Sequence, residues 1–509
     1  MQAASRANGR MPIAVTATVV TVLLLASLAI AAAPAVGKKP AQVYGWGWDL
    51  HGSLGDGKPN TSNKVRRAPV AVTALGGVTQ IAYSDDPATG LALLDNGHVM
   101  GWGREDGNAT EESTTPVAVE GLGEVTSVAA GEAKLALLGD GTVMAWGDDQ
   151  NGAVGDGTTV WKHLAVTVGG LSGVVAISAY GEHSLAVLSN GTVWEWGRAY
   201  ERDGLGRPIH DAPVQVPAIA GAVAVAAGGE AGYALLASGE VLAWGAYGRG
   251  ELGDGESLEP GEEESLGPPP NPVYVCAVGA KGTELANRDC SGGPHLTGVT
   301  AIAAGRWFAV AAIEDGTAVA WGANESGQLG DGTNEGPEVC LPPGYYCSGL
   351  PVPVSGLSGV RAVAAGERHA LAALKDGSVA SWGGNEHGQL GAGSGAFGAT
   401  AELVPGLSGI WGVGGGGAVS YAFHSPRPAV TKSKPAKGSA GNVVTIEGSS
   451  LLTATDVEFG ATPATSFTVI SPTRIEAIAP ALAPGTYDVA VTDPSGTSLS
   501  AEKATFTVK

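Results

Sequence analysis

The sequence predicts an all-β chain: a seven-bladed β-propeller, closed by pairing of its N- and C-terminal strands, followed by an immunoglobulin-like β-sandwich. Glycine supplies 81 of 509 residues, about twice its usual share of roughly 7%. Each glycine costs about 1 kcal/mol in a helix relative to alanine, so long helices are disfavoured. A tryptophan–glycine pair returns seven times, and the half-repeat missing before the first pair stands alone after the last. These three observations carry the prediction.

The first segment, residues 1–35, is interpreted as a secretory signal peptide or an N-terminal membrane anchor. Arg6 and Arg10 precede the apolar run VVTVLLLASLAIAAA, and the small residues Ala33-Pro34-Ala35 follow it. A basic start, an apolar centre and small residues at the end are typical of an export signal, although an apolar run of about 20 residues can also span a bilayer. We therefore expect a protein that is secreted or held in the extracellular cell envelope, or alternatively one anchored by this segment.

Residues 42–425 carry the repeat. A complete copy reads GEVTSVAAGEAKLALLGDGTVMAWG, in which short apolar runs flank an Asp140-Gly141 hairpin turn. Repeats of roughly 40–50 residues built from short strands are typical of propeller blades. The half-repeat GIWGVGGGGAVSYAF would complete the last blade by pairing with the first strand, VYGWG. The repeat tryptophans are Trp46, Trp102, Trp146, Trp196, Trp244, Trp321 and Trp382.

The runs LALLxDGTVxAWG and NExGQLG resemble the regulator of chromosome condensation family of seven-bladed propellers, from Tyr44 to Phe423. The resemblance implies the fold and a scaffold role for the seven tryptophans, which we expect to pack between blades. It also implies guanine-nucleotide exchange on a small GTPase as one possible activity. Propellers host unrelated functions, so the fold alone does not assign one.

Two insertions interrupt the repeat and contain all four cysteines. In an oxidising compartment we expect local disulfides, Cys276–Cys290 and Cys340–Cys347, that staple loops with no core of their own. Zinc is the competing interpretation, but neither pair has the CxxC spacing expected of a four-cysteine site. The segment CLPPGYYC presents Tyr345 and Tyr346 as a candidate binding loop, because tyrosine offers a large contact area at low entropic cost. The alternative is a surface insertion with no partner.

After the propeller, residues 426–438 are interpreted as a Pro/Lys/Ser linker. Residues 439–509 resemble an IPT/TIG domain, an immunoglobulin-like module, through Gly441, the runs VTIEGSSL and VEFG, and the Pro484-Gly485 turn. In TYDVAV the larger side chains alternate with smaller or polar ones, as in a sandwich strand. We expect this module to act as a terminal spacer or an adhesion domain.

Motifs that could carry chemistry are weak. Two G-x-G-x-x-G segments, 248–253 and 393–398, are not followed by the helix that a dinucleotide site needs. The run from Asp148 suggests a calcium loop, but position twelve is Thr159 where an EF-hand needs glutamate. We expect no catalytic residue, no cofactor and no metal.

A net charge of −21 argues against nucleic acid, since phosphate binding needs clustered Lys and Arg. The sequence therefore favours a monomeric, non-catalytic binding or scaffold protein that displays propeller loops to a protein or cell-envelope ligand. The membrane would be a partner only if the N-terminal segment stays attached. A guanine-nucleotide-exchange-type regulator and a carbohydrate-binding lectin are the alternatives.

Overall fold

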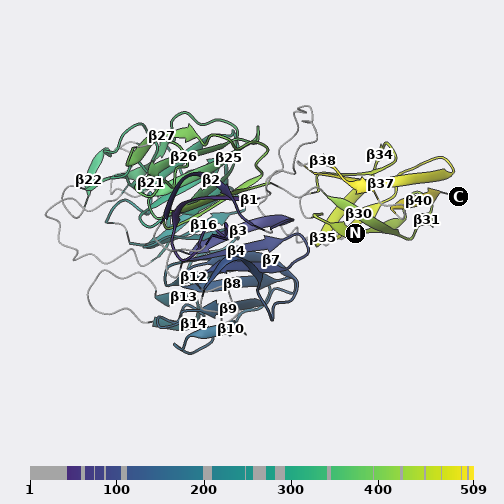
Figure 1. Ribbon diagram of the computed structural model, residues 1–509, viewed down its shortest axis with the longest axis horizontal. Helices are drawn as coiled ribbons and strands as arrows, with labels where there is room; N and C mark the ends of the chain where they lie inside the picture. Colours follow the sequence, from purple (N-terminus) through teal and green to yellow (C-terminus); the bar gives the residue numbers. More distant parts are fainter. Residues whose placement is uncertain are drawn as a thin grey trace, which may run out of the picture.

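The computed structural model describes residues 43–508, except 59–63, 74, 85–87, 105–111, 199–208, 247, 256–270, 281–289, 291–292, 341–344, 394, 425–427, 452–453, 472, 494–495 and 501–503. Every regular element in the described residues is a strand, as expected (Figure 1). This part of the chain consequently holds no helix that is long and apolar enough to cross a membrane. The signal or anchor predicted at residues 1–35 lies outside the described residues.

Seven sheets form seven blades, which we number in chain order. Blade 1 contains β3 (Val78–Ser84), β4 (Thr89–Leu94), β5 (Val99–Gly103) and β6 (Ser113–Ala118). Blade 2 contains β7 (Val125–Ala130), β8 (Ala133–Leu138), β9 (Val143–Gly147) and β10 (Lys162–Thr167). Blade 3 contains β11 (Val174–Tyr180), β12 (His183–Leu188), β13 (Val193–Arg198) and β14 (Ile209–Gln215). Blade 4 contains β15 (Ala222–Ala227), β16 (Ala231–Leu236), β17 (Val241–Gly245) and β18 (Val273–Tyr274). Blade 5 contains β19 (Val299–Ala304), β20 (Phe308–Ile313), β21 (Ala318–Ala323), β22 (Glu338–Cys340) and β23 (Tyr345–Pro353). Blade 6 contains β24 (Val360–Ala365), β25 (His369–Leu374), β26 (Val379–Gly384) and β27 (Phe397–Leu403).

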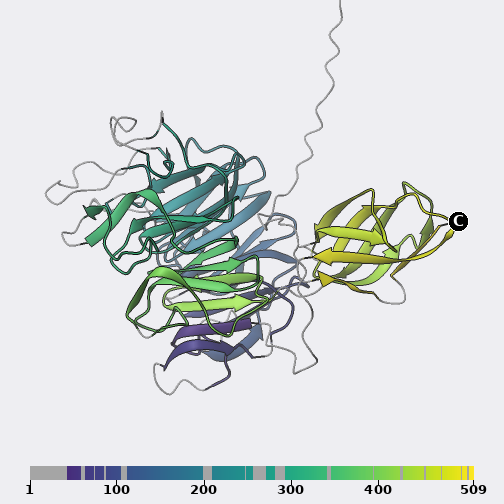
Figure 2. The same cartoon turned by 90° about the horizontal axis from the view of Figure 1, so that it is seen from above.

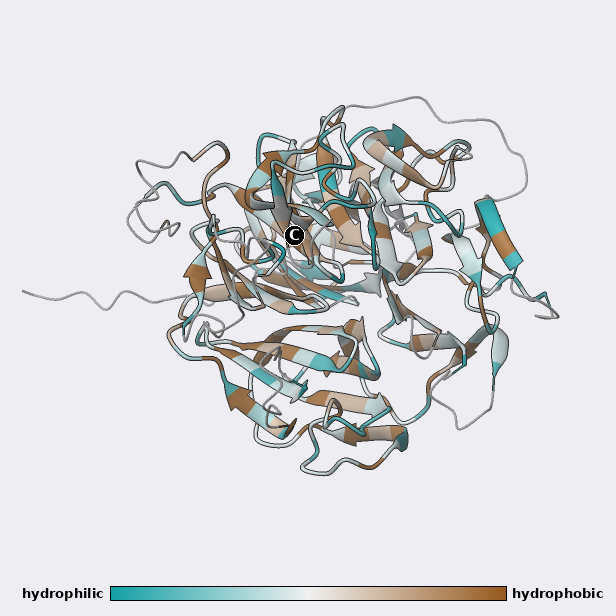
Figure 3. Cartoon of the chain, turned by 90° about the vertical axis from the view of Figure 1, so that its left-hand side faces the viewer, coloured by the Kyte–Doolittle hydropathy of each residue, from teal (hydrophilic) through white to brown (hydrophobic). Residues whose placement is uncertain are grey.

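Blade 7 is built from both ends of the repeat region, as the isolated half-repeat predicts. Its strand order is β2 (Lys64–Ala71), β1 (Val43–Asp49), β29 (Val419–Phe423) and β28 (Gly412–Gly416). The register of β1 on β29 is antiparallel and unbroken, from Val43 opposite Phe423 to Gly47 opposite Val419. The first strands of successive blades contact one another around the ring, and β28 contacts both β24 and β3. The ring is therefore closed, and Figure 3 shows its blades arranged around a common axis.

The hairpin turns follow one local rule. Asp140 Oδ1 accepts a hydrogen bond from the backbone N–H of Thr142, and Gly141 has φ +83°. The aspartate at the start of the turn fixes two residues of backbone, and glycine supplies the left-handed conformation that the next position requires. The same bond and the same positive φ recur at the turns of four other blades, at Asn96-Gly97, Asn190-Gly191, Asp315-Gly316 and Asp376-Gly377.

A second local rule shapes the loop after the tryptophan–glycine pair in four blades. The side-chain oxygen of Asn324 accepts from the backbone N–H of Leu329 at 3.0 Å, and Asn385 holds Leu390 in the same way at 3.1 Å. In two other blades the same position is an acid: Asp149 holds Val154 at 2.9 Å and Asp49 holds Leu54 at 3.4 Å. Burial raises the pKa of the Asp149 carboxyl to about 6, and the nearby Asp156 carboxylate adds to the effect.

We expect Asp149→Asn to stabilise the protein at neutral pH. The folded state holds the Asp149 proton more tightly than the unfolded chain, so the contribution of Asp149 to the free energy of unfolding falls as pH rises from about 4 to about 6 and stays low above that. The asparagine side chain would still accept the hydrogen bond from the Val154 N–H, but it has no ionisable group. The variant should gain about 1–3 kcal/mol at pH 7 and much less at pH 4, measured as a thermal midpoint across pH 4–8. The reverse change, Asn324→Asp, should show the opposite trend, and a gain of equal size at both pH values would contradict the argument.

The propeller has two distinct faces. We call the face that carries the hairpin turns, such as Asp140-Gly141, the turn face. The opposite face carries the connections between the first and second strands and between the third and fourth strands of each blade, and we call it the loop face. A cavity of about 310 Å³ runs along the axis between them, lined mainly by alanine, valine and glycine of the first strands.

The C-terminal domain is a sandwich of two sheets, as predicted. One contains β35 (Ser466–Ser471), β36 (Arg474–Ile478), β32 (Val443–Ser449), β30 (Ala429–Lys434) and β39 (Leu499–Ser500). The other contains β31 (Lys437–Gly438), β40 (Thr505–Val508), β37 (Gly485–Asp493), β33 (Asp456–Phe459) and β34 (Thr462–Pro463), with β38 (Gly496–Thr497) paired to β37. Phe459 and Phe506 meet edge to face in the core at 5.5 Å.

The linker assignment for residues 426–438 is wrong for most of its length. Strand β30 pairs with β32 from Ala429 opposite Ser449 to Lys434 opposite Thr445. Val430 and Ser433 are both buried. Proline, lysine and serine indicate a linker by composition, but here they belong to a strand whose inward side chains fill the sandwich.

The C-terminal domain lies on the turn-face side of the propeller. Its Ser450 donates a hydrogen bond to Asp95 in the first hairpin turn, with 2.5 Å between Oγ and Oδ2. Figures 1 and 2 show this domain in yellow at one end of the long axis, while β22 lies at the other end in Figure 1. The domain therefore leaves the loop face open.

Candidate binding site on the loop face

One position recurs around the loop face, immediately before the second strand of each blade. Its carbonyl oxygen accepts a hydrogen bond from the backbone N–H that follows the tryptophan–glycine pair, at 2.7–3.3 Å. We call the seven residues the ring positions: Ala88, Glu132, Glu182, Glu230, Trp307, Arg368 and Ala418.

The same contact explains the glycine of the repeated pair. The seven pair glycines have φ between +92° and +111°. At Gly383 an added Cβ would lie 2.5 Å from the carbonyl oxygen of Arg368. A larger residue would therefore be strained and would also displace the ring position. The glycine is thus a scaffold requirement that places the loop-face side chains.

The structure places all seven repeat tryptophans in the propeller core, each at most 8% exposed. Five of them donate their indole N–H to a backbone carbonyl in the preceding blade, at 2.7–3.0 Å: Trp46 to Gln389, Trp102 to Ser53, Trp196 to Ala153, Trp321 to Glu251 and Trp382 to Gln328. Trp244 instead donates to the Glu195 carboxylate of blade 3 at 2.9 Å. Trp146 Nε1 has no hydrogen-bond partner among the residues that the structure describes.

The side chains at the ring positions divide the loop face by charge. Blades 2, 3 and 4 present Glu132, Glu182 and Glu230, while blades 5 and 6 present Trp307 and Arg368. Arg306, next to Trp307, adds a second exposed cation. The loop face therefore has an acidic arc and, beside it, a sector that carries arginine and tryptophan.

Trp307 is the centre of an arginine–aromatic cluster. The guanidinium carbon of Arg249 lies 4.1 Å from the centre of the Trp307 ring and 4.6 Å from that of Tyr345. The guanidinium carbons of Arg306 and Arg368 lie 4.4 Å and 5.2 Å from the Trp307 ring. These distances are within the range of cation–π attraction. Blades 4, 5 and 6 all contribute to the cluster, which the packing of these consecutive blades brings together.

Carboxylates fix the cluster in place. Trp307 donates its indole N–H to Glu230 Oε1 at 2.9 Å. Arg306 Nη1 lies 2.8 Å from Glu367 Oε1, and Arg249 Nη1 lies 3.5 Å from Glu325 Oε1. Each arginine is consequently held by both an aromatic ring and, at differing distances, an acid, which limits its freedom before any ligand arrives.

A buried acid lies beneath this cluster. Glu251 is 1% exposed, and its Oε2 accepts from the backbone N–H of Arg249 at 2.8 Å. Burial raises the pKa of Glu251 to about 7, and the charge of Glu230 adds to that effect. Its backbone carbonyl also receives the Trp321 indole. Glu251 thus contacts both the buried Trp321 of blade 5 and the loop that carries Arg249.

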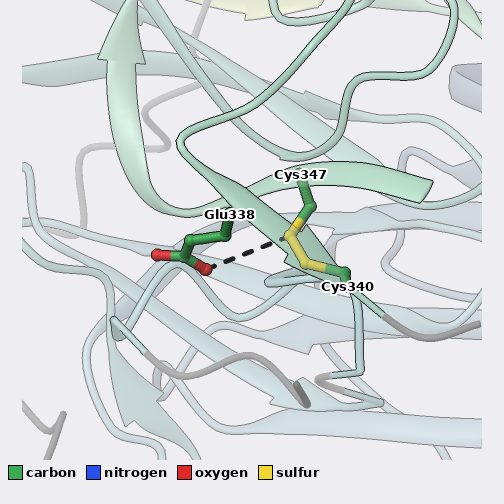
Figure 4. Close-up of side chains that lie close together, drawn as sticks. All are labelled: Glu338, Cys340 and Cys347. Carbon is green, nitrogen blue, oxygen red and sulfur yellow. Dashed lines mark hydrogen bonds between the residues drawn. A yellow bond between two sulfur atoms is a disulfide. The ribbon is translucent and has the colours of Figure 1, made fainter. Parts of the chain in front are cut away.

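The structure pairs Cys276 with Cys290 and Cys340 with Cys347, with Cα–Cα distances of 5.6 Å and 6.0 Å. The second pair closes the β22–β23 hairpin (Figure 4). Tyr345 begins β23 and contacts Arg249, whereas Tyr346 lies on the opposite side of the strand because adjacent side chains alternate. One of the two tyrosines predicted as a binding loop therefore belongs to the cluster.

Figure 4 also shows Glu338 beside the second disulfide, with its Oε2 4.0 Å from Cys347 Sγ. Among the described residues, Glu338, Cys340 and Cys347 are the group of metal-ligating types whose ligand atoms lie within 4.8 Å of one another. The two sulfurs are bonded to each other, so neither is a thiolate that could bind a metal. We therefore assign these three residues a structural role in the β22–β23 hairpin.

Sequence reasoning missed Trp307, Arg306, Arg368 and Arg249. A signal was present: at the aligned position before the second strand, glutamate in three blades gives way to tryptophan and then arginine. Arg249 comes from a loop of another blade, and no sequence pattern near it predicts that it contacts Trp307.

Family comparisons match both parts of the chain. The regulator of chromosome condensation (RCC1) repeat matches residues 299–328, 315–373 and 360–389, and the IPT/TIG domain matches residues 428–508. The mitochondrial RCC1 domain-containing protein RUG3 of Arabidopsis thaliana is 39% identical over 98 residues, which are 19% of this chain and 20% of that protein. Protein pim1 of Schizosaccharomyces pombe is 37% identical over 99 residues, 19% of this chain and 18% of its own length.

A third relative, the human E3 ubiquitin-protein ligase HERC2, is 31% identical over 144 residues, 28% of this chain but 3% of that protein. The matches thus span a fifth or less of these relatives. Among solved structures, Prp20p from Saccharomyces cerevisiae has a TM-score of 0.62 at 20% identity, covering 76% of this chain and 92% of that one. Human WBSCR16 has a TM-score of 0.58 at 18% identity, covering 75% and 98%.

The structural likeness confirms the propeller, and the sequence matches confirm the resemblances on which the two domains were identified. The chain therefore carries RCC1 repeats at residues 299–389, within its seven-bladed propeller, and an IPT/TIG domain at residues 428–508.

Proposed function

We propose that this protein is an exported, non-catalytic binding protein that holds a protein ligand on the loop face of its propeller. The observation that carries the proposal is the cluster of Trp307, Arg249, Arg306, Arg368 and Tyr345 on one sector of that face. Tryptophan, tyrosine and arginine are the residues that most often dominate the binding energy of protein interfaces.

The cluster is mounted on a rigid frame. Backbone hydrogen bonds join the loops of neighbouring blades: Gly229 donates to Gly305, Arg306 to Glu367, and Glu367 to Gly417, at 2.8–3.1 Å. A surface that is already ordered loses little entropy when a partner binds. Export is supported by the signal-like residues 1–35 and by the two cysteine pairs, which suit an oxidising compartment.

The test is capture of a ligand by the full chain, compared with one variant on each face. Trp307→Ala removes the centre of the cluster. Trp194→Ala is the matched control, because Trp194 is also half-buried but lies beside the Asn190-Gly191 turn on the turn face. The chain would be immobilised and exposed to secreted and envelope fractions of the producing cells, and retained proteins would be identified by mass spectrometry.

We expect a protein that the wild type and Trp194→Ala retain equally and that Trp307→Ala binds about 30-fold more weakly, the effect of losing an interface hot spot. Equal retention by Trp307→Ala would contradict the proposal. The two alternatives predict other outcomes. An exchange-type regulator should speed the release of labelled GDP from a GTPase, and a lectin should bind cell-wall polysaccharide and be eluted by free sugar.

A further inference from the structure

The arginine–aromatic cluster departs from the charge of the rest of the protein. The chain has a net charge of −21, and three of the five ring positions with large side chains are glutamates. Three arginines nevertheless gather around one tryptophan. Glu230, Glu325 and Glu367 lie beside these arginines, so an anion would be attracted by the outer edges of the exposed guanidinium groups and not by a net positive charge of the cluster.

The guanidinium groups of this sector have donors to spare. Arg306 and Arg368 are 48% and 38% exposed at their side chains. Arg306 gives Nη1 to Glu367, and Arg368 approaches the same carboxylate only through Nε, at 3.7 Å. Among the described residues, Nη1 and Nη2 of Arg368 and Nη2 of Arg306 donate no hydrogen bond. Two planar forks are therefore held in place with their outer edges free, the arrangement that binds carboxylates in bidentate fashion.

The position of Trp307 narrows the chemistry of the ligand. Guanidinium groups from three arginines lie over its ring, at 4.1–5.2 Å from the ring centre, so the ring serves to orient arginines. The neighbouring Glu182 and Glu230 disfavour long polyanions, which would have to cross the acidic arc. A short run of carboxylates fits the sector and avoids the arc.

We propose that the edge formed by Arg306 and Arg368 binds an acidic segment of a partner protein, a short stretch of Asp and Glu side chains. This inference rests on the proposed loop-face function and names the chemistry of its ligand. Arg249 has a different role, because it is 7% exposed and lies between Trp307 and Tyr345. It supports the two exposed arginines through the shared indole.

The probe is a fluorescein-labelled peptide, Gly-Glu-Asp-Glu-Asp-Gly, compared with Gly-Gln-Asn-Gln-Asn-Gly, and the measurement is fluorescence anisotropy with the full chain. The test variant is Arg306→Gln with Arg368→Gln. The matched control is Arg198→Gln, because Arg198 is also exposed on the loop face and also pairs with a glutamate, Glu182, at 3.3 Å. Thermal midpoints would show that all variants are folded, as substitutions of exposed arginines should leave them.

We expect the acidic peptide to bind the wild type and Arg198→Gln equally and to bind the double variant about tenfold more weakly or not at all. Binding should weaken when salt is raised from 20 to 200 mM, since exposed charges are screened, and the amide peptide should not bind. Replacing both arginines by lysine should recover part of the affinity, because charge returns without the planar fork. Equal binding by the double variant, no binding of the acidic peptide at 20 mM salt, or tighter binding of tripolyphosphate than of the peptide would overturn the inference.

The double variant also separates this inference from the proposed function. In the capture experiment, a ligand lost by Trp307→Ala but kept by the double variant would leave the loop-face function standing and overturn the acidic-segment inference. Arginine-dependent binding of the peptide with no protein captured by the wild type would support the inference and contradict the proposed function.

Discussion

Replacing Trp321 with alanine is expected to lower the free energy of unfolding by about 3–5 kcal/mol. Trp321 is fully buried where blade 5 meets blade 4. Its ring meets that of Tyr233 edge to face at 5.9 Å, and its N–H donates to the carbonyl of Glu251 at 2.9 Å. Alanine would leave a cavity in a core that is shared by two blades. It would also remove one of the two side-chain hydrogen bonds to the Glu251 carbonyl, which would keep the bond from the Tyr233 hydroxyl at 2.7 Å.

The measurement is the thermal midpoint and the urea midpoint of each variant. Trp161→Ala is the matched control, since Trp161 is 38% exposed at the edge of blade 2; it should change the midpoint little. Trp321→Phe keeps most of the volume but loses the N–H, so it should fall between wild type and Trp321→Ala. If Trp161→Ala cost as much as Trp321→Ala, tryptophans between blades would have no special share in stability.

Sequence alone predicts the propeller well because each blade obeys local rules. An Asx–Gly turn is fixed by bonds within three residues, as at Asp140, and the pair glycine is fixed by a close backbone approach, as at Gly383. The closing of the ring was predicted for a different reason. The half-repeat at 409–423 has no strands of its own to complete a blade, and only β1 and β2 are left to supply them.

The candidate site was predicted less well because it is not local. Tyr345 was chosen for its constrained loop, but its contact is with Arg249, which lies in the loop after β17 on another blade. Trp307 and Arg368 come together only because blades 5 and 6 are neighbours in a ring. The sequence shows that tryptophan replaces glutamate at position 307 of the repeat. It does not show which loops of other blades lie close to that position, so the residues that contact Trp307 could not be predicted.

The linker error has a similar cause. Composition indicates whether a segment can build a core of its own, and the segment 426–438 cannot. Strand β30 nevertheless contributes Val430 and Ser433 to a core built by the rest of the domain, and Ser433 donates its hydroxyl to the carbonyl of Thr505. A short strand that joins an existing sheet needs few apolar residues, so polarity alone does not exclude it.

A disulfide across the closing blade is expected to stabilise the propeller substantially. Tyr44 lies directly opposite Ala422 where β1 pairs with β29. Cα atoms in such antiparallel pairs are about 4.5–5.5 Å apart, which is within the range that a disulfide spans. We expect Tyr44→Cys with Ala422→Cys to form a bond that closes almost the whole repeat region into a loop.

Because the two partners are so distant in sequence, the bond should restrict the unfolded chain strongly and raise the free energy of unfolding by about 2–5 kcal/mol. The measurement compares the thermal midpoint of the oxidised and reduced double variant. Wild type treated in the same way corrects for Cys276–Cys290 and Cys340–Cys347, and Tyr44→Cys alone corrects for the lost contact between Tyr44 and His424. A gain no larger than that of wild type, with the new bond verified by mass spectrometry, would contradict the expectation, because the bond would then strain the native pairing as much as it restricts the unfolded chain. A large gain would show that the β1–β29 register accepts the bond without such strain, as expected if the two ends of the repeat region are paired in the folded protein.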